Sequence, residues 1–269
     1  MQITLYQDRS ELVENKGFFC YSLSYPLGIF CVCYKIMSKT SLKAVPNHVV
    51  IIPDGNRRWA KKRGLEPIEG HRKGLDTALS IARDSRGLGV KILTLWGFST
   101  ENWKRSELEV KYLMKIYVWF FRKHLKELVR DGVKFKWLGR RDRVPKSLRD
   151  VLLNMEKVTA KNKEYLLNIC IDYGGHEEMI SAIKKIVSKK IKPSQITEEM
   201  VAKNLETAGV PDPDLLIRTS GEMRTSGIMP WQTTYTELFF SKLLFPDFSL
   251  AELKRAIADY SYRQRRFGQ

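Results

Sequence analysis

The sequence predicts a single α/β domain in which a central, mostly parallel β-sheet is flanked by helices. Three observations support this fold class. From residue 48 onward, short apolar runs typical of buried strands alternate with longer segments of helical periodicity. The chain has 269 residues, enough for one large domain or two small ones. No internal repeat or low-complexity linker divides this stretch, which favours one domain.

The first elements follow directly from these patterns. Val49–Ile52 is a short apolar run that ends at Pro53, as expected for a fully buried strand. Helical spacing over Glu69–Leu88 predicts a helix. The run Val90–Trp96 predicts a second strand, and Ser106–Arg130 a long helix.

The second half continues the alternation. Gly132 ends the long helix, and Val133–Leu138 is the next predicted strand. Pro145–Lys161 is expected to be helical, with Pro145 in the first turn, and Tyr165–Ile171 is a further strand. Two helices, two strand-like runs and a last helix complete the domain: Glu177–Ser188, Glu198–Ala208, Asp214–Arg218, Glu237–Phe240 and Leu250–Tyr260.

Residues 1–45 differ from the rest and are interpreted as an N-terminal extension to a domain over residues 46–269. The stretch Gly17–Tyr34 carries no charge and is close to the lower length limit of a membrane span, but Pro26 and several hydroxyls argue against a span. Charges of both signs upstream and the lack of a small-residue cleavage site argue against a signal peptide. Met37 fits a natural start, so we interpret the upstream residues as an over-extended reading frame. An amphipathic or peripheral membrane segment is the alternative.

The composition narrows the classes of protein only in part. A formal net charge of +17 fits nucleic acid, anionic lipid or phosphorylated small substrates as partners, and equally a lysine-rich surface without a partner. The four cysteines form neither a CxxC pair nor a cluster with zinc spacing. This argues against a disulfide framework and fits a reducing compartment such as the cytoplasm.

Ligands of open α/β sheets bind beyond the carboxyl ends of the strands, and three polar clusters follow strands there. The first is "PDGNRRW", in which Gly55 allows a tight turn and Asn56 can cap the next helix. Arg57 and Arg58 can bind phosphate bidentately. Asp54 among arginines stays ionised, which makes it a candidate Mg²⁺ ligand for a diphosphate. A capped turn before a solvated basic helix is the alternative.

The second cluster is "GFSTENWKR", which follows the strand Val90–Trp96. It offers hydroxyls, a carboxylate, an amide, an indole and a guanidinium from Ser99, Thr100, Glu101, Asn102, Trp103 and Arg105. A serine- and threonine-rich cap for the long helix, with Trp103 as a hydrophobic staple, explains part of it. Capping alone does not require Asn102, Trp103 and Arg105 together.

The third cluster is "IRTSGEMRTSG", which follows the strand "DLLI". Arg218 and Arg224 alternate here with glycines and with hydroxyls such as Thr225 and Ser226, which suits an oxyanion cradle. The spacing is not that of a P-loop. Further on, Glu237 heads a strand, where a paired structural acid is the usual role unless another site acid lies near.

Together the clusters place arginines, hydroxyls and two acids at one edge of a sheet, which points to phosphorylated substrates. The long helix adds a second feature, because Val118, Trp119, Phe120 and Phe121 are consecutive and make it apolar almost all round. Such a helix is buried in a core or lines an apolar cavity. An apolar tunnel below a diphosphate-binding rim is the sharper interpretation.

Several segments resemble the signature regions of the cis-prenyltransferases, the (Z)-isoprenyl diphosphate synthases that include undecaprenyl diphosphate synthase. They are "HVVIIPDGNRRWAKK", "GFSTENWKR", "NICIDYGG", "LLIRTSGEMRTSG", "PWQTTYTELFF" and the terminal "RRFG", in order from His48 to Gly268. The resemblance implies a cytoplasmic homodimer that uses Mg²⁺, has an apolar tunnel and contacts the membrane peripherally at product release. The implied reaction condenses isopentenyl diphosphate with geranyl or farnesyl diphosphate to a (Z)-polyprenyl diphosphate lipid carrier. Nucleic acid is not implied as a partner.

The resemblance also implies roles for single residues. Asp54 matches the essential aspartate that places Mg²⁺, and Glu237 the metal-binding glutamate. Asn102 matches a residue often named as proton acceptor, but an amide is too weakly basic, so we expect it to orient groups while a diphosphate oxygen takes the proton. The remaining matches are allylic contacts (Gly55, Asn56, Arg58, Trp59, His71), second-motif residues (Ser99, Trp103, Arg105) and isopentenyl diphosphate contacts (Arg218, Arg224, Ser226).

The chain also departs from the family pattern. Arg57 stands where many members have glycine, and its role is left open. Pro67 stands where many have a phosphate-binding arginine, for which Arg63 or Arg72 could substitute. Two other classes of protein stay as alternatives. A non-catalytic partner subunit of a heteromeric prenyltransferase would tend to lack the acid and arginines that this chain keeps. A basic nucleic-acid-binding protein would show a basic helix or an aromatic strand motif.

Overall fold

The computed structural model describes residues 18–25, 28–35 and 44–263. The chain divides into two units, residues 1–42 and residues 43–269. In the first unit, strands β1 (Phe18–Tyr25) and β2 (Gly28–Lys35) pair antiparallel. None of the helices in the described ranges combines the length and apolar character needed to cross a bilayer.

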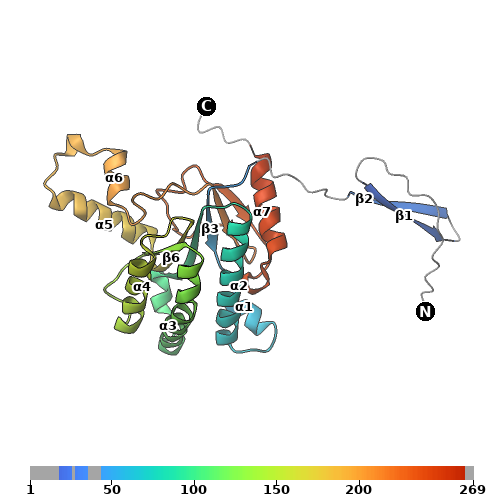
Figure 1. Ribbon diagram of the computed structural model, residues 1–269, viewed down its shortest axis with the longest axis horizontal. Helices are drawn as coiled ribbons and strands as arrows, with labels where there is room; N and C mark the ends of the chain where they lie inside the picture. Colours follow the sequence, from blue (N-terminus) through green and yellow to red (C-terminus); the bar gives the residue numbers. More distant parts are fainter. Residues whose placement is uncertain (1–17, 26–27, 36–43, 264–269) are drawn as a thin grey trace. The chain divides into compact units, whose positions relative to one another are not determined.

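The second unit is built on one six-stranded sheet with the order β5-β6-β4-β3-β7-β8 (Figure 1). All five neighbouring pairs are parallel, so the sheet is parallel throughout and not only mostly so. The strands are β3 His48–Ile52, β4 Ile92–Ser99, β5 Val133–Leu138, β6 Tyr165–Tyr173, β7 Leu215–Arg218 and β8 Glu237–Phe240.

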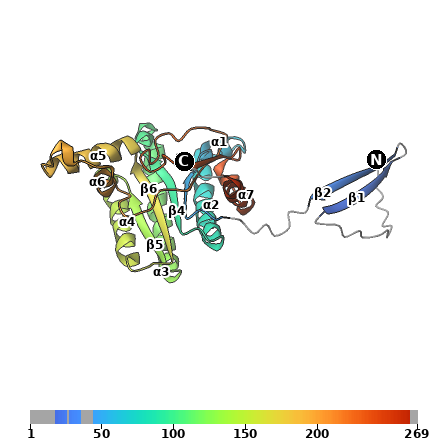
Figure 2. The same cartoon turned by 90° about the horizontal axis from the view of Figure 1, so that it is seen from above.

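Seven α-helices surround this sheet in the described part of the second unit, which confirms the predicted α/β class. Helix α2 contacts α1, α3 and α7. Figure 2 shows α1, α2 and α7 together on one side of β4. The helices are α1 Asn56–Lys61, α2 Pro67–Gly87, α3 Glu107–Arg130, α4 Lys146–Thr159, α5 Gly175–Ser188, α6 Glu198–Asn204 and α7 Leu250–Tyr262. Three short 3-10 helices are η1 Thr100–Lys104, η2 Pro193–Gln195 and η3 Phe245–Asp247.

The observed bounds show which local signals are strong. Strand β5 has the predicted bounds, and α3 begins where Ser106 accepts a hydrogen bond from the backbone N–H of Glu109 (3.3 Å). Pro145 caps α4 from outside and does not stand in its first turn. Helix α6 ends at Asn204, before the predicted Ala208, because tertiary contacts hold this residue: Lys185 and Lys189 donate hydrogen bonds to it.

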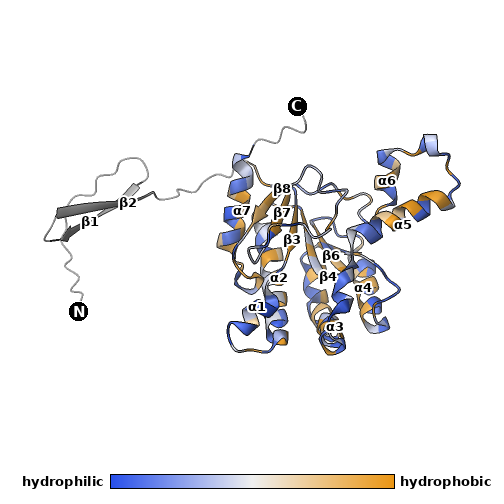
Figure 3. Cartoon of the chain, turned by 180° about the vertical axis from the view of Figure 1, so that it is seen from behind, coloured by the Kyte–Doolittle hydropathy of each residue, from blue (hydrophilic) through white to orange (hydrophobic). Residues whose placement is uncertain are grey.

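The core lies on the strands and on the helix faces turned to them. Strand β3 is fully buried because β4 and β7 flank it and helices cover it. Figure 3 shows the apolar strands β3, β7 and β8 beside helices whose other faces are hydrophilic. One buried cluster joins neighbouring strands through Val50, Ile52, Trp96, Leu138, Cys170 and Leu216.

The chain connections define a crevice in this sheet. From β3 the chain continues to β4 on one side, whereas from β7 it continues to β8 on the other. Neighbouring strands with divergent connections leave space beyond their carboxyl ends, where ligands of such sheets bind. The space beyond β3 and β7 is therefore the expected position of a ligand site.

Candidate functional site

Asp54 and Arg218 join the ends of β3 and β7. The backbone N–H of Asp54 donates to Thr219 Oγ1 (2.9 Å), and the Thr219 hydroxyl donates to the Asp54 carbonyl (2.7 Å). Arg218 Nη2 donates to Asp54 Oδ2 at 3.0 Å. Arg218 is 5% exposed, so this is a nearly buried guanidinium against a half-buried carboxylate. The first and third predicted clusters thus meet in one site.

The turn after Asp54 depends on glycine. Gly55 has φ 107°, and a Cβ there would lie 2.8 Å from Leu244, so both conformation and space require glycine. Gly55 is also the N-cap of α1, and the prediction that Asn56 caps this helix is wrong. Asn56 is the first helical residue, and its Nδ2 donates to the Pro53 carbonyl at 3.4 Å.

Arg58 links the start of α1 to the third cluster. Its Nη2 donates to Ser220 Oγ (2.6 Å) and Asp54 Oδ1 (3.3 Å). Its Nη1 donates to Glu222 Oε1 at 3.2 Å, and Arg224 Nη1 donates to the other oxygen of Glu222 at 2.5 Å. Three arginines, counting Arg218, therefore gather around two carboxylates.

The loop after β7 has the backbone of an anion cradle. Ser220, Gly221, Ser226 and Gly227 all have positive φ, which turns the chain tightly on both sides of Arg224. Arg218 Nη1 donates to Ser226 Oγ (2.7 Å) and to the Arg224 carbonyl, which holds the loop against β7. The Thr225 side chain is half-buried and outside the cavity lining described below.

The second cluster forms η1 at the end of β4. Asn102 Oδ1 accepts from the Ser99 N–H (3.1 Å), and both residues form a capping box and line the cavity. Trp103 turns elsewhere: its indole N–H donates to Asp172 Oδ1 (2.8 Å), and its ring packs edge-on against Phe98. Trp103 thus lies outside the lining of this cavity.

Several predicted residues are held away from the cavity. Trp59 Nε1 donates to Asp247 Oδ1 (2.7 Å), and Thr100 Oγ1 donates to Glu101 Oε1 (2.8 Å); only Glu101 of these lines the cavity. The two arginines offered for the Pro67 position have protein partners in this structure. Arg63 pairs with Asp247, and Arg72 donates to Tyr112.

Glu109 is a site residue that the sequence reasoning missed. Its carboxylate lies 3.0 Å from Arg105 Nη1, 3.5 Å from His71 Nε2 and 3.6 Å from Arg57 Nη1. This contact gives Arg57, whose role was left open, an ion pair at the rim. In the sequence, Glu109 looks like an ordinary acid in the first turn of a helix, and only the fold brings two arginines and a neutral histidine to it.

Glu237 does not join Asp54 in this chain. It is the first residue of β8, level with Leu215 at the start of β7, whereas Asp54 follows the end of β3. The two acids therefore stand at opposite ends of parallel strands. Glu237 instead accepts from Arg263 Nη1 at 2.7 Å, which corrects the expectation that both acids line one metal site.

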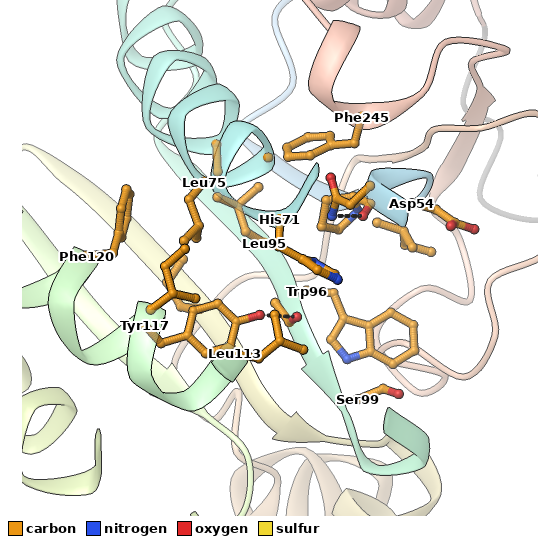
Figure 4. A pocket seen from close by; sticks show the side chains of 18 of the residues that line it. Asp54, His71, Leu75, Leu95, Trp96, Ser99, Leu113, Tyr117, Phe120 and Phe245 are labelled. Carbon is orange, nitrogen blue, oxygen red and sulfur yellow. Dashed lines mark hydrogen bonds between the residues drawn. The ribbon is translucent and has the colours of Figure 1, made fainter. Parts of the chain in front are cut away.

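A cavity of about 440 Å³ opens beside these groups. Figure 4 shows Asp54 at one end and Phe120 at the other, with His71, Leu113 and Tyr117 between them. The polar lining comes from Asp54, Asn56, His71, Ser99, Glu101, Asn102, Arg105, Arg218 and Ser226. The apolar lining comes mainly from α2, α3 and β6: Leu75, Ala78, Leu79, Ala82, Leu113, Ile116, Phe120, Phe121, Leu128, Leu167 and Ile169.

The polar end is short of hydrogen bonds. Five buried side-chain polar atoms lack a partner in the described part of the chain. Three of them belong to residues that line the cavity: Asn56 Oδ1, Arg218 Nε and His71 Nε2, the last of which has the Glu109 carboxylate 3.5 Å away. Buried polar atoms are rarely left unpaired, so Asn56 Oδ1 and Arg218 Nε mark a place where a polar ligand group would be bound.

The charge states at this end are set by the neighbours. Burial raises the pKa of Asp54, but the hydrogen bond from Arg218 and the charges of Arg58 and Arg218 outweigh it, so the pKa is lowered and the carboxylate stays ionised. Burial and the charge of Arg105 lower the pKa of His71 to about 4, against the opposing charge of Glu109. His71 is therefore neutral near pH 7.

Arginines, an ionised aspartate and hydroxyls at one end of an apolar cavity define a class of protein. It is an enzyme for substrates that combine a phosphate-like group with a hydrocarbon chain. Comparison with known proteins specifies this class. Residues 52–268 match the family model Prenyltransf, described as undecaprenyl diphosphate synthase. The chain therefore belongs to this family of isoprenyl transferases.

Individual relatives agree with the family match. An isoprenyl transferase of Streptococcus agalactiae is 43% identical over 235 residues, which cover 84% of this chain and 94% of the relative. Lavandulyl diphosphate synthase from Lavandula x intermedia, solved with dimethylallyl diphosphate, is 40% identical with a TM-score of 0.81 over 84% of this chain and 99% of its own. A probable undecaprenyl diphosphate synthase from Campylobacter jejuni is 27% identical with a TM-score of 0.71, covering 84% and 100%.

Proposed function

We propose that this chain condenses isopentenyl diphosphate with an allylic diphosphate in the cis configuration, releasing diphosphate and lengthening a (Z)-polyprenyl diphosphate. The observation that carries the proposal is the Asp54–Arg218 pair at the mouth of a cavity that is apolar over most of its length. An apolar cavity suits a growing hydrocarbon chain, and two neighbouring arginine groups suit two diphosphates. The solved relative with bound dimethylallyl diphosphate supports the allylic substrate class.

The two diphosphates are assigned to the two sides of the pair. The allylic diphosphate is placed against Gly55, Asn56 and Arg58, with its hydrocarbon chain in the cavity. Isopentenyl diphosphate is placed against the loop of Arg224 and Ser226. Arg218 lies between them, because it bonds both Asp54 and Ser226.

Mg²⁺ fits this site through one protein ligand. The Asp54 carboxylate is 30% exposed, so it can reach a bound ion while Arg58 and Arg218 keep it ionised. Mg²⁺ often takes one or two carboxylates and completes its shell with substrate phosphates and water. No group of three metal-ligating side chains occurs among the described residues, which agrees with a site that needs the diphosphate. When bound, the ion would stabilise negative charge on the departing diphosphate.

The proposed reaction breaks one C–O bond, forms one C–C bond and transfers one proton. The allylic C–O bond breaks and its electron pair leaves with the diphosphate, whose charge Arg58 and Arg218 stabilise. The isopentenyl double bond forms the new C–C bond, and a proton leaves the adjacent carbon for a diphosphate oxygen. Asn102 is bound to the Ser99 backbone and is too weakly basic to take that proton, so it serves to orient substrate.

The proposal is tested by turnover. Purified protein is incubated with labelled isopentenyl diphosphate, geranyl or farnesyl diphosphate and Mg²⁺, and the products are extracted and chromatographed after dephosphorylation. Labelled polyprenyl product with cis double bonds is expected, and chelation of Mg²⁺ should abolish it. Absence of any labelled lipid from an intact, folded sample would refute the proposal.

The protein acts as a homodimer in this proposal. Ile180, Ile183 and Val187 are 47%, 50% and 67% exposed and follow one another at helical spacing along α5. An exposed apolar row of this kind is usually buried against a partner, and α5 of a second copy would present a matching apolar row. Ile183→Glu should then shift the mass measured by sedimentation toward the monomer, while a monomeric wild type would contradict the assignment.

The expected setting is the cytoplasm, with peripheral contact between the protein and the membrane that receives the product. A polyprenyl chain is too apolar to enter water freely, so its transfer favours a membrane close to the cavity.

A further inference from the structure

The outward face of α3 takes no part in the proposed reaction, yet it has a regular pattern. Six exposed residues follow one another at steps of three or four and so lie in one stripe: Leu108, Lys111, Lys115, Trp119, Arg122 and Lys126. Two of them are apolar and well exposed, Leu108 at 81% and Trp119 at 54%. We call this set the α3 stripe.

The charge of this face is strongly positive. Helix α3 exposes six cations and one acid, Glu107. Glu107 pairs with Lys111 (2.6 Å), whereas Glu109 and Glu127 turn inward to Arg105 and Arg83. Within the described ranges Lys115, Arg122 and Lys126 form no ion pair, so their charge is available to a partner.

An apolar groove adjoins the stripe. It has a volume of about 780 Å³, and its apolar lining comes from Val110, Met114 and Val118 of α3 together with Trp103 and Pro145. Its polar lining comes from Arg105, Glu107, Lys111, Lys115 and Ser147, so three cations face one acid, and that acid pairs with Lys111. An exposed apolar groove bordered by lysines fits a partner that has both hydrocarbon and negative charge.

We propose that the α3 stripe and this groove dock the protein on the surface of a membrane that contains anionic lipid. Clustered lysines and arginines attract anionic headgroups, and tryptophan is favoured at the level of the headgroups. Nucleic acid is the other polyanion to consider, but Trp103 is the only aromatic residue among the described residues that line the groove, which offers few ring faces on which bases could stack. Acyl chains or glycerol backbones fit such a lining better.

The docking gives the proposed reaction a direction, and this step alone rests on the proposed function. The inner side of α3 lines the reaction cavity with Leu113, Tyr117 and Phe120, while the stripe faces outward from the same helix. A protein attached through α3 holds its apolar product one helix away from the lipid. The chain could then leave for the bilayer without a long path through water.

The test measures binding to vesicles in the absence of substrate. Full-length protein is co-sedimented with vesicles of phosphatidylcholine alone or mixed with phosphatidylglycerol. The triple variant Lys115→Glu, Arg122→Glu, Lys126→Glu is compared with a control that has the same charge change elsewhere. The control replaces the exposed Lys163, Lys192 and Lys254 by glutamate.

The wild type and the control should bind the anionic vesicles, and the stripe variant should bind about a hundredfold more weakly, since each cation contributes about a fivefold factor. Trp119→Phe should remove a blue shift of tryptophan emission that the wild type shows on binding. If both triple variants lose vesicle binding equally, the effect is due to net charge alone and the proposal is overturned. Tighter, stripe-dependent binding of single- or double-stranded DNA would also overturn it.

Turnover in detergent should be the same in all variants. Turnover without vesicle binding would refute the docking surface alone, and vesicle binding without turnover would refute the proposed function alone.

Discussion

The carboxylate of Asp54 is the central group of the candidate site. It receives Arg58 from one side and Arg218 from the other, and Arg218 is nearly buried. Removing the carboxylate therefore acts twice, because it takes away the candidate metal ligand and leaves a guanidinium without its partner.

We predict that Asp54→Asn lowers kcat by about a hundredfold or more, the usual effect of losing one electrostatic group in a reaction centre. The amide keeps the shape and one hydrogen bond, so circular dichroism should show a folded protein. Steady-state turnover with varied Mg²⁺ is the measurement. Activity within a few-fold of wild type would remove Asp54 from this role.

Buried neutral histidines predict how stability depends on pH. Burial lowers the pKa of His48 to about 4, although the Pro211 carbonyl and Asp214 act in the opposite direction. With an unfolded value of 6.5, the unfolded chain binds more protons between pH 6.5 and 4, so acidification destabilises the fold there. The expected slope is about 1.4 kcal/mol per pH unit for each such histidine, and His71 adds a second.

Urea unfolding at several pH values checks this slope. His48→Gln should reduce the slope between pH 6.5 and 4.5 to about half, whatever its effect on stability at pH 7. A slope that stays unchanged in the variant would show that His48 titrates normally in the folded protein.

Between elements, the close contact of α1 with α2 positions the allylic side of the site. A Cβ on Gly70 would lie 2.0 Å from the Asn56 backbone carbonyl oxygen. Only glycine at position 70 therefore allows α1 and α2 to approach as closely as they do. Gly70→Ala should displace α1, cost about 1–3 kcal/mol and raise the KM for the allylic substrate more than that for isopentenyl diphosphate.

Gly87→Ala is the matched control for this change. Gly87 is the last residue of the same helix, and no atom lies within 4 Å of a Cβ built there. This substitution should leave KM unchanged and stability equal or slightly higher. If both variants behave alike, the contact at Gly70 does not position the site.

The end of β6 supports the second motif through Asp172. This fully buried aspartate has φ 54°, accepts from Arg143 Nε (2.9 Å) and from Trp103 Nε1 (2.8 Å), and so anchors η1. Asp172→Ala should cost about 3 kcal/mol, whereas Asp172→Asn should cost less, since asparagine tolerates this backbone and can still bond Trp103. Thermal unfolding of the two variants gives the order, and the reverse order would contradict this account.

At the scale of the whole molecule, α2, α3 and β6 supply most of the apolar lining of the cavity in which we propose that the hydrocarbon chain lies. Phe120 is 7% exposed and lines the cavity far from Asp54 (Figure 4). Phe120→Ala should lengthen the products by one or more isoprene units, seen by chromatography after dephosphorylation. The control is Trp119→Ala, the neighbouring aromatic that faces outward and should leave product length unchanged in detergent.

The fold was largely predictable because the residues that end its helices and strands act locally. Pro53 follows the end of β3 and Gly132 precedes the start of β5, and both strands lie almost where predicted. Boundaries set by tertiary contacts were missed, as at α6, which ends at Asn204 where lysines of α5 bind it.

The site was predictable as a set of motifs and less so as geometry. Asp54 and Arg218 meet as expected because parallel strands end at one edge. Glu237 was predicted correctly at the head of its strand, but the head of a parallel strand lies at the edge opposite the carboxyl ends, so its assignment to the edge of Asp54 was wrong. Glu109 was missed because an acid in a helix's first turn has an ordinary local explanation, and its partners Arg57, His71 and Arg105 come from α1, α2 and the residue after η1.

The bond between Asp54 and Arg218 has a consequence for how the binding of one substrate affects the binding of the other. Any ligand that draws Arg218 toward the loop of Ser226 weakens its hold on Asp54, and a ligand that engages Asp54 frees Arg218 in turn. In the proposed assignment the two half-sites are thermodynamically linked, and each substrate should change the affinity of the other by the same factor. A chain that stays bound while successive isopentenyl units arrive would benefit, because an occupied allylic side prepares the cradle for the next unit.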